Sequence, residues 1–150
     1  MSRNVPDYED ANLILRLYEE RREPKLREAR EWFIREFKAT SFAELAKKYP
    51  PGSDENRMVR MMVSYWDMVG AIVNAKILDS SLFFQTTGEH LIVWEKIRPF
   101  VAEQREAQKN PLVYRNLEQL AAAHYAWLDQ QHPGLAETRM QFFRSLIDRK

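Results

Sequence analysis

The segment that decides the fold runs from Asp54 to Leu78 and reads DENRMVRMMVSYWDMVGAIVNAKIL. It contains no proline and a single glycine, so its composition favours one uninterrupted helix. At 100° per residue, the polar residues in its middle fall within a sector of about 100°, and the rest of the surface is apolar. A helix that is apolar around most of its circumference is covered by its neighbours. We therefore predict one long central helix with other helices packed around it.

The polar sector of this segment is the first candidate functional site, a groove formed by Arg60, Ser64, Asp67 and Asn74. One interpretation is a narrow stripe that faces solvent. The other is a groove walled by neighbouring helices, in which Asp67 would be a partly buried carboxylate, and such groups are often paired with arginine or functional. A closed pocket around Asp67 would favour a ligand-binding or enzymatic domain. An exposed stripe with a separate apolar patch would favour an interaction domain.

Turn residues and prolines divide the rest of the chain into further helices. No stretch alternates apolar and polar residues strictly enough to predict a strand. With 150 residues, the chain has the usual length of one domain. We predict an all-α fold, a compact bundle of about six or seven helices in a single domain over residues 1–150. The helices outside the central one are expected over residues 7–38, 42–49, 110–131 and 135–148, with a further helix that opens at Thr86 and includes Val101.

The first of these segments leaves an alternative open at Pro24. If the helical period runs straight through the proline, the segment is one kinked helix with an apolar face. Proline also disfavours helical geometry at Glu23 and removes a backbone donor, which would split the segment into two helices. The apolar face of the continuous helix would consist of Ala11, Leu15, Leu26, Ala29, Phe33 and Phe37.

Four polar residues predict where later helices begin. Ser41 and Thr86 are each followed three residues later by a glutamate, which is the spacing of a capping box. Ser53, with Asp54 as the alternative, can cap the long apolar helix after a proline-rich turn, and Asn110 precedes a first-turn proline at Pro111.

The charge and composition exclude several kinds of partner. The formal net charge is +1, and basic and acidic residues are nearly balanced in each third of the chain, so no basic patch predicts nucleic-acid binding. The most apolar segment is interrupted by Arg60, Asp67 and Lys76, which makes it a poor membrane span. The chain has no cysteine, and a reducing, cytoplasmic location fits that composition best.

Catalytic and metal-binding patterns are weak. The three histidines, His90, His124 and His132, do not share metal-ligand spacing, and neither His90 nor His124 has a glutamate three residues before it. No serine stands in a nucleophile motif, and no glycine-rich turn could hold a phosphate. We expect no metal and no cofactor, and we expect that the protein is not an enzyme.

The carboxy-terminal helices supply a candidate interface. The chain contains 8 Phe, 6 Tyr and 4 Trp, and a small bundle must leave some of these rings on its surface. Tyr125 and Trp127 do not share one seam with the other aromatics of their helix, and the adjacent Phe142 and Phe143 cannot both face one core. We therefore expect these four residues to form the interface of a symmetric homodimer.

Several stretches resemble a small bacterial all-helical family known only as a domain of unknown function. The resemblance covers most of the chain and rests on helix-packing residues and one turn, so it implies the fold and carries no active site. The stretches that carry it are residues 12–19 (NLILRLYE), 22–24 (REP), 29–33 (AREWF), 49–52 (YPPG) and 65–66 (YW).

From these observations we expect a non-enzymatic helical interaction or regulatory domain that forms a homodimer and can bind another protein. The alternative is a small-ligand-binding or enzymatic domain that uses the polar groove around Asp67.

Overall fold

The computed structural model describes residues 5–148, and every regular element in that range is an α-helix. The prediction of an all-α fold is confirmed, with one or two more helices than expected because the first segment splits in two and residues 80–86 form a helix of their own. The eight helices of the described range are α1 (Tyr8–Arg21), α2 (Pro24–Arg35), α3 (Phe42–Lys48), α4 (Asp54–Asn74), α5 (Ser80–Thr86), α6 (Glu89–Ala107), α7 (Arg115–Gln131) and α8 (Leu135–Asp148).

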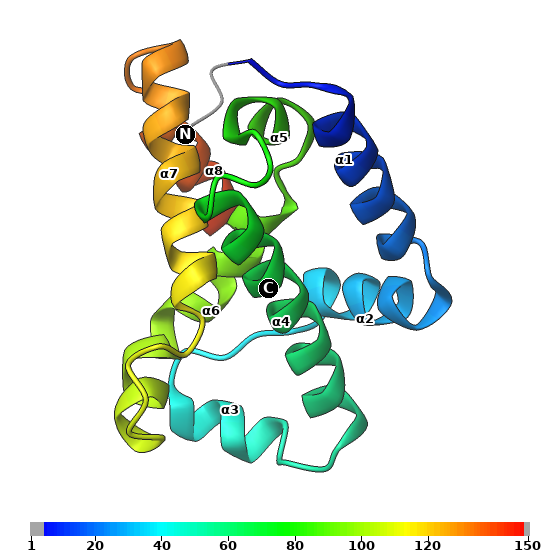
Figure 1. Ribbon diagram of the computed structural model, residues 1–150. Coiled ribbons are helices and arrows are strands. Elements are labelled where there is room, and N and C mark those ends of the chain that lie inside the picture. The colour runs from blue at the N-terminus through cyan, green and yellow to red at the C-terminus, as the bar shows by residue number, and fades with distance from the viewer. Residues whose placement is uncertain (1–4, 149–150) are drawn as a thin grey trace.

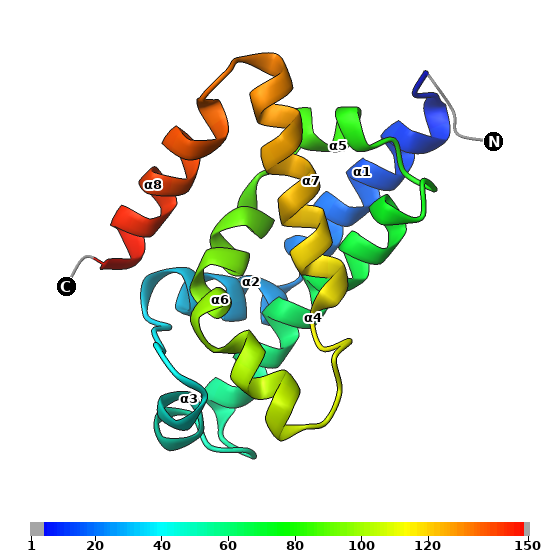
Figure 2. The ribbon, with the colours of Figure 1, turned by 90° about the vertical axis from the view of Figure 1, so that its left-hand side faces the viewer.

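The longest helix, α4, packs against four others. It contacts α2, α5, α6 and α7, and in Figure 1 it runs between α7 on one side and α1 and α2 on the other. Helix α8 packs against α6 and α7 at the far side of the molecule from α1 (Figure 2). Helix α3 contacts α6, and α1 contacts α2.

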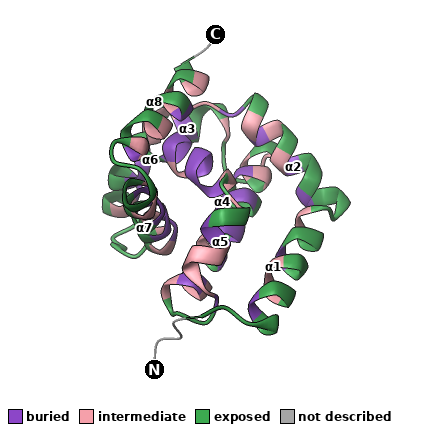
Figure 3. Cartoon of the chain, turned by 90° about the horizontal axis from the view of Figure 1, so that it is seen from above, coloured by how far each residue is buried: buried purple, intermediate pink, exposed green. Residues whose placement is uncertain are grey.

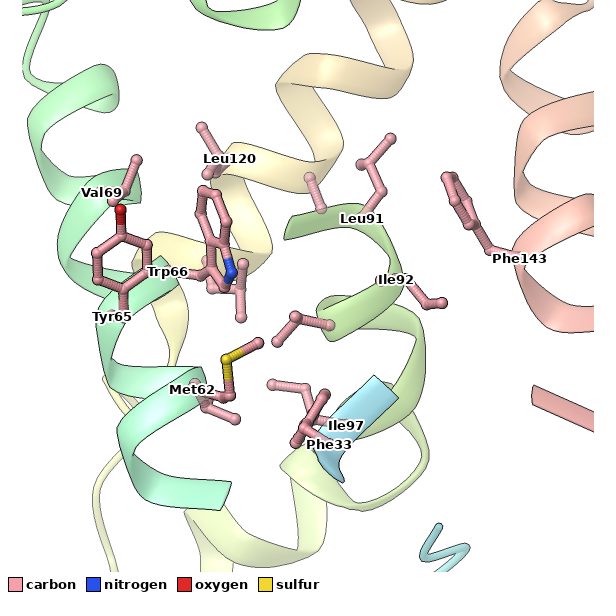
Figure 4. Packing of buried hydrophobic residues seen from close by; sticks show 14 of the residues in the cluster. Phe33, Met62, Tyr65, Trp66, Val69, Leu91, Ile92, Ile97, Leu120 and Phe143 are labelled. Carbon is pink, nitrogen blue, oxygen red and sulfur yellow. The ribbon is translucent and has the colours of Figure 1, made fainter. Parts of the chain in front are cut away.

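The core lies where α2, α4, α6 and α7 meet. Figure 4 shows Phe33, Met62, Trp66, Ile97 and Leu120 pointing toward one another from these four helices. Each of these side chains is at most 1% exposed. Burial of large apolar side chains is the main favourable contribution to folding, so these four helices form the stable centre of the structure.

Two of the four predicted helix starts are confirmed and two are wrong. The side chains of Ser41 and Ser53 each accept a hydrogen bond from a first-turn backbone N–H, at the start of α3 and α4. Thr86 ends α5, and α6 begins at Glu89, whose carboxylate binds arginines instead of closing a capping box. Residues 110–114 do not form a helix, so α7 begins at Arg115, four residues later than a cap at Asn110 predicts.

The helix is interrupted just before Pro24, so the alternative of two helices is the correct one. Helix α1 ends at Arg21, Pro24 is the first residue of α2, and the Glu23 carboxylate caps α2 by accepting the backbone N–H of Leu26 at 3.0 Å. Because the two helices are not collinear, they do not share one apolar face. The expected members Leu26, Ala29, Phe33 and Phe37 are buried, whereas Ala11 and Leu15 are exposed.

Candidate functional site

The polar stripe of α4 is exposed to solvent over its first part and packs against α7 over its second part. Arg60 and Ser64 are exposed, whereas Asp67 and Asn74 are half-buried against the beginning of α7. The Asp67 Oδ1 accepts the backbone N–H of Leu117 at 2.9 Å. The structure therefore does not bring the four candidate groove residues together into one site.

Asp67 supplies the cap that α7 lacks from its own sequence. Tyr114 occupies the N-cap position with a φ of 53°, and its side chain makes no capping bond within the described range. The first N–H groups of a helix have no partner inside the helix, so an acceptor from elsewhere is needed. Asp67 provides it for Leu117, and its negative charge is stabilised by the positive end of the α7 dipole.

Gly70 lets α4 and α7 approach each other closely. A Cβ atom at this position would lie 2.6 Å from the carbonyl oxygen of Asn116, which is too close for any side chain. One turn further along α4, the Asn74 Nδ2 donates to that same carbonyl at 3.1 Å. Asp67, Gly70 and Asn74 together form a polar contact between two helices.

A cavity of about 540 Å³ lies beside this junction, between α3, α4, α6 and the turn that precedes α7. Arg60 and Asp67 both line it, and Ser64 and Asn74 do not. The walled groove is thus formed by a different set of residues from the one that the periodicity of α4 predicts.

A buried ionic cluster around Glu89 joins four helices. The Glu89 carboxylate, at the first residue of α6, pairs with Arg21 of α1 at 2.8 Å and with Arg30 of α2. The Trp66 Nε1 of α4 donates to the same carboxylate at 3.3 Å, and the Arg21 guanidinium lies over the Trp66 ring. Removal of one partner from such a cluster leaves a buried charge uncompensated, so these residues hold the helices in place.

Two histidines that are 34 residues apart in the sequence meet in the core. The His90 Nε2 lies 2.7 Å from the His124 Nδ1, and the His124 ring stacks on Phe84. Burial is the largest cause that lowers the pKa of His90, with the neighbouring His124 adding to it, and burial lowers the pKa of His124 to about 4. Both rings are therefore neutral at physiological pH and act as core residues.

Lys96 caps the C-terminal end of α2. Its Nζ donates to the backbone carbonyls of Phe33, Ile34 and Phe37 at 2.8–2.9 Å. Burial lowers the pKa of Lys96 to about 8, while the three carbonyls favour the charged ammonium form, so the side chain is protonated at neutral pH. A cation at a helix C-terminus satisfies carbonyls that have no partner inside the helix.

The four candidate interface residues are mostly inside the fold. Tyr125 and Phe143 are 8% and 9% exposed, and Trp127 is half-buried and donates to the Ser81 Oγ at 3.2 Å. Only Phe142 is exposed, at 46%. The expectation that these rings form one exposed cluster is wrong, because Tyr125 and Phe143 belong to the buried core and Trp127 packs against Phe84 of α5.

Helix α1 carries a row of exposed apolar residues, two of which had been expected in the core. Tyr8, Ala11, Leu15 and Tyr18 are all exposed, and they follow one another at intervals of three, four and three residues. At 100° per residue they fall within a sector of about 80° on the helix surface. We refer to these four residues as the α1 seam. Figure 3 shows that most of α1 is exposed.

A groove of about 350 Å³ runs beside the seam, between α1 and α5. Leu15 and Tyr18 of the seam line it together with Trp66, Phe83 and Thr87. The 3–4–3 spacing can be read from the sequence, but only the alternative of a continuous helix through Pro24 assigned a face to this segment, and it placed Ala11 and Leu15 in the core.

These features define the protein as an all-helical domain in which buried charges join helices and one helix exposes an apolar seam. The chain belongs to the family described as a domain of unknown function, DUF4760, whose model matches residues 7–127. The match begins at the N-cap of α1 and ends within α7, so it contains the seam and excludes α8. No curated protein and no solved structure matches the chain. Among the described helices, none is both long and apolar enough to cross a membrane.

Proposed function

We propose that this protein is a non-enzymatic helical interaction domain and that it forms a homodimer through α1. The observation that carries the proposal is the α1 seam, in which Tyr8, Leu15 and Tyr18 are 87%, 60% and 55% exposed on one face of one helix. Apolar residues scattered singly over a surface are ordinary, but a continuous apolar strip beside a groove is typical of an interface. A cytoplasmic location and a single-domain chain are part of the proposal.

The spacing of the seam suits a second helix. Intervals of three and four residues are those of the core positions in a coiled coil, where side chains of one helix fit between those of the other. An amphipathic helix laid on α1 would also cover Leu15 and Tyr18 where they line the groove between α1 and α5.

A second copy of this chain is the partner we favour, because the seam is complementary to itself. Its intervals read the same in both directions, so two α1 helices related by a twofold axis and lying antiparallel would place Tyr8 against Tyr18 of the partner copy. The same arrangement places Ala11 against Leu15 of the partner copy, a small residue against a large one. Twofold pairing of identical surfaces is the commonest form of protein oligomer.

Three charged side chains at helix junctions make structural contacts, which supports a non-enzymatic role. Glu89 pairs with two arginines, Lys96 binds three carbonyls, and Asp67 caps α7. Catalytic groups are usually charged residues with perturbed pKa values in a cleft, free to act on a substrate. In this fold the equivalent groups contribute to helix packing.

Light scattering coupled to size-exclusion chromatography tests the proposal from low micromolar to several hundred micromolar protein. We expect the mass to rise from that of the 17.9 kDa chain to twice that value. Leu15→Arg should abolish the rise, since it places a charge in the centre of the seam. The matched control is Ile77→Arg, because Ile77 is 61% exposed against 60% for Leu15 and lies outside the seam.

Two results would overturn the proposal. A mass that stays at one chain up to the highest concentration would exclude the homodimer. A dimer that survives Leu15→Arg would place the interface elsewhere, and Phe142→Arg would then test the exposed ring of α8.

A further inference from the structure

The cavity between α3, α4 and α6 is separate from the α1 seam and has the composition of a ligand site. Its volume of about 540 Å³ lies within the range of about 300–1,000 Å³ that is usual for small-molecule pockets. Its floor is apolar and is formed by Val59, Val63, Ile97, Phe100 and Leu45. Ligand pockets combine such a floor with a few converging polar groups.

A buried amide in the cavity wall has an unused acceptor. Gln104 is only 8% exposed, and its Oε1 has no hydrogen-bond partner among residues 5–148. Burial raises the pKa of Tyr114, which also lines the cavity, and the neighbouring Gln104 side chain lowers it. A buried polar atom without a partner costs free energy, and a donor from a ligand would satisfy it.

Tyr114 has an energetically unfavourable backbone conformation. Its φ of 53° lies in the left-handed region, which is unfavourable for a residue with a side chain. Residues in this region persist where the surrounding structure holds them, and they are more frequent at functional sites than elsewhere.

One cation of the cavity wall is free to bind an anion. Within the described part of the chain, Arg60 forms no ion pair, whereas its neighbour Arg57 pairs with Asp54. The one carboxylate of the cavity wall, Asp67, is already engaged by the Leu117 N–H at the positive end of α7. Arg60 is therefore the charged group that a ligand would meet.

We propose that this cavity binds a small amphipathic carboxylate whose apolar body carries a hydrogen-bond donor. The body packs on the floor formed by α4 and α6, the donor binds the Gln104 Oε1, and the carboxylate pairs with Arg60. The site is independent of self-association through α1, because the cavity and the seam share no residues.

Indole-3-acetate is a suitable probe, since it combines an aromatic body, an N–H donor and a carboxylate. Two compounds with the same ring and a different head, neutral indole-3-acetamide and cationic tryptamine, test the role of charge. 1-Methylindole-3-acetate tests the donor. Binding is measured by amide chemical-shift changes in ¹H–¹⁵N NMR spectra of the whole chain, at probe concentrations from about 10 μM to 5 mM, a range that brackets weak binding.

We expect indole-3-acetate to shift the amides of cavity residues and to bind at least tenfold more tightly than the amide, the amine or the N-methyl compound. Arg60→Gln should remove the preference for the carboxylate, and the matched control Arg57→Gln should leave it unchanged. Both arginines are exposed, so neither change threatens the fold.

A second pair of variants tests the location. Ala46 and Ala43 are both exposed on α3, but only Ala46 lines the cavity. Ala46→Trp should fill the opening and abolish binding, whereas Ala43→Trp should not.

The proposal fails if no probe shifts the cavity residues at 5 mM. It also fails if tryptamine binds as tightly as the carboxylate, or if Ala46→Trp binds as the unmodified chain does.

Discussion

Helices α1 and α4 are both rich in large apolar residues, yet α4 buries most of them and α1 leaves most of them exposed or half-buried. Helix α4 buries Met62, Trp66 and other apolar side chains in the core, whereas α1 buries only Leu17 among its large ones. Helix α1 is held by polar contacts: the Tyr65 hydroxyl donates to the carbonyl of Leu17 at 2.7 Å, and the Asp10 Oδ1 accepts the backbone N–H of Asp79 at 2.9 Å. The difference indicates that α4 contributes more to the stability of the core, while α1 leaves apolar residues exposed, as the proposed dimer requires.

The largest expected effect contrasts one aromatic residue from each helix. Trp66→Ala should lower the free energy of unfolding by about 3–5 kcal/mol, because it empties a fully buried site. Tyr18→Ala should change it by no more than about 0.5 kcal/mol, because Tyr18 is exposed in the monomer. Urea denaturation at low micromolar protein measures both. Equal losses would show that α1 is as tightly packed as α4.

The next effect concerns pH and the two buried histidines next to α4. The ordinary histidine pKa is 6.5, and both folded values lie below it, so at lower pH the unfolded chain binds protons that the folded chain does not. Stability is therefore complete well above pH 6.5 and falls as the pH drops through 6.5 toward 5, with His124 contributing about 2 kcal/mol of the loss. His124→Asn should remove roughly half of this loss.

The control for the histidine prediction is His132→Asn, because His132 is exposed after the end of α7. It should leave the pH dependence unchanged. Urea denaturation at each pH supplies the free energies. A loss of stability that His124→Asn does not reduce would assign the acid sensitivity to other groups.

The smallest expected effect tests the junction of α4 with α7. Asp67→Ala should cost about 1 kcal/mol, as the loss of an N-cap does, and Asp67→Asn should cost less because the amide keeps an acceptor oxygen. Ser64→Ala, on the exposed part of the same stripe, should change stability by no more than about 0.5 kcal/mol. If Asp67→Ala matched Ser64→Ala, the carboxylate would not be acting as the cap, and thermal denaturation of the three variants decides this.

The sequence predicted those features that depend on local chemistry. The all-helical fold followed from composition and from the absence of strand alternation, and Ser41 and Ser53 begin helices as their positions indicate. The end of α7 at Gln131 and the extent of α8 were also predicted, because the residues that stop a helix lie next to it.

Features that depend on contacts between distant residues could not be predicted. Glu89 looked like half of a capping box, but it binds arginines from α1 and α2. Helix α7 begins at Arg115 and not directly after Asn110, because its cap comes from Asp67, about 50 residues earlier in the chain. The pairing of His90 with His124 has no local signal, since it depends on how α6 and α7 pack.

Hydrogen exchange followed by mass spectrometry, at low and at high protein concentration, tests the central claim most directly. At low concentration we expect the amides of α1 to exchange faster than those of α4, since α1 has few buried apolar contacts. At high concentration, protection of α1 should increase while that of α4 stays constant, because a second copy covers the seam. Exchange of α1 as slow as that of α4 at low concentration, with no change on concentration, would contradict the account.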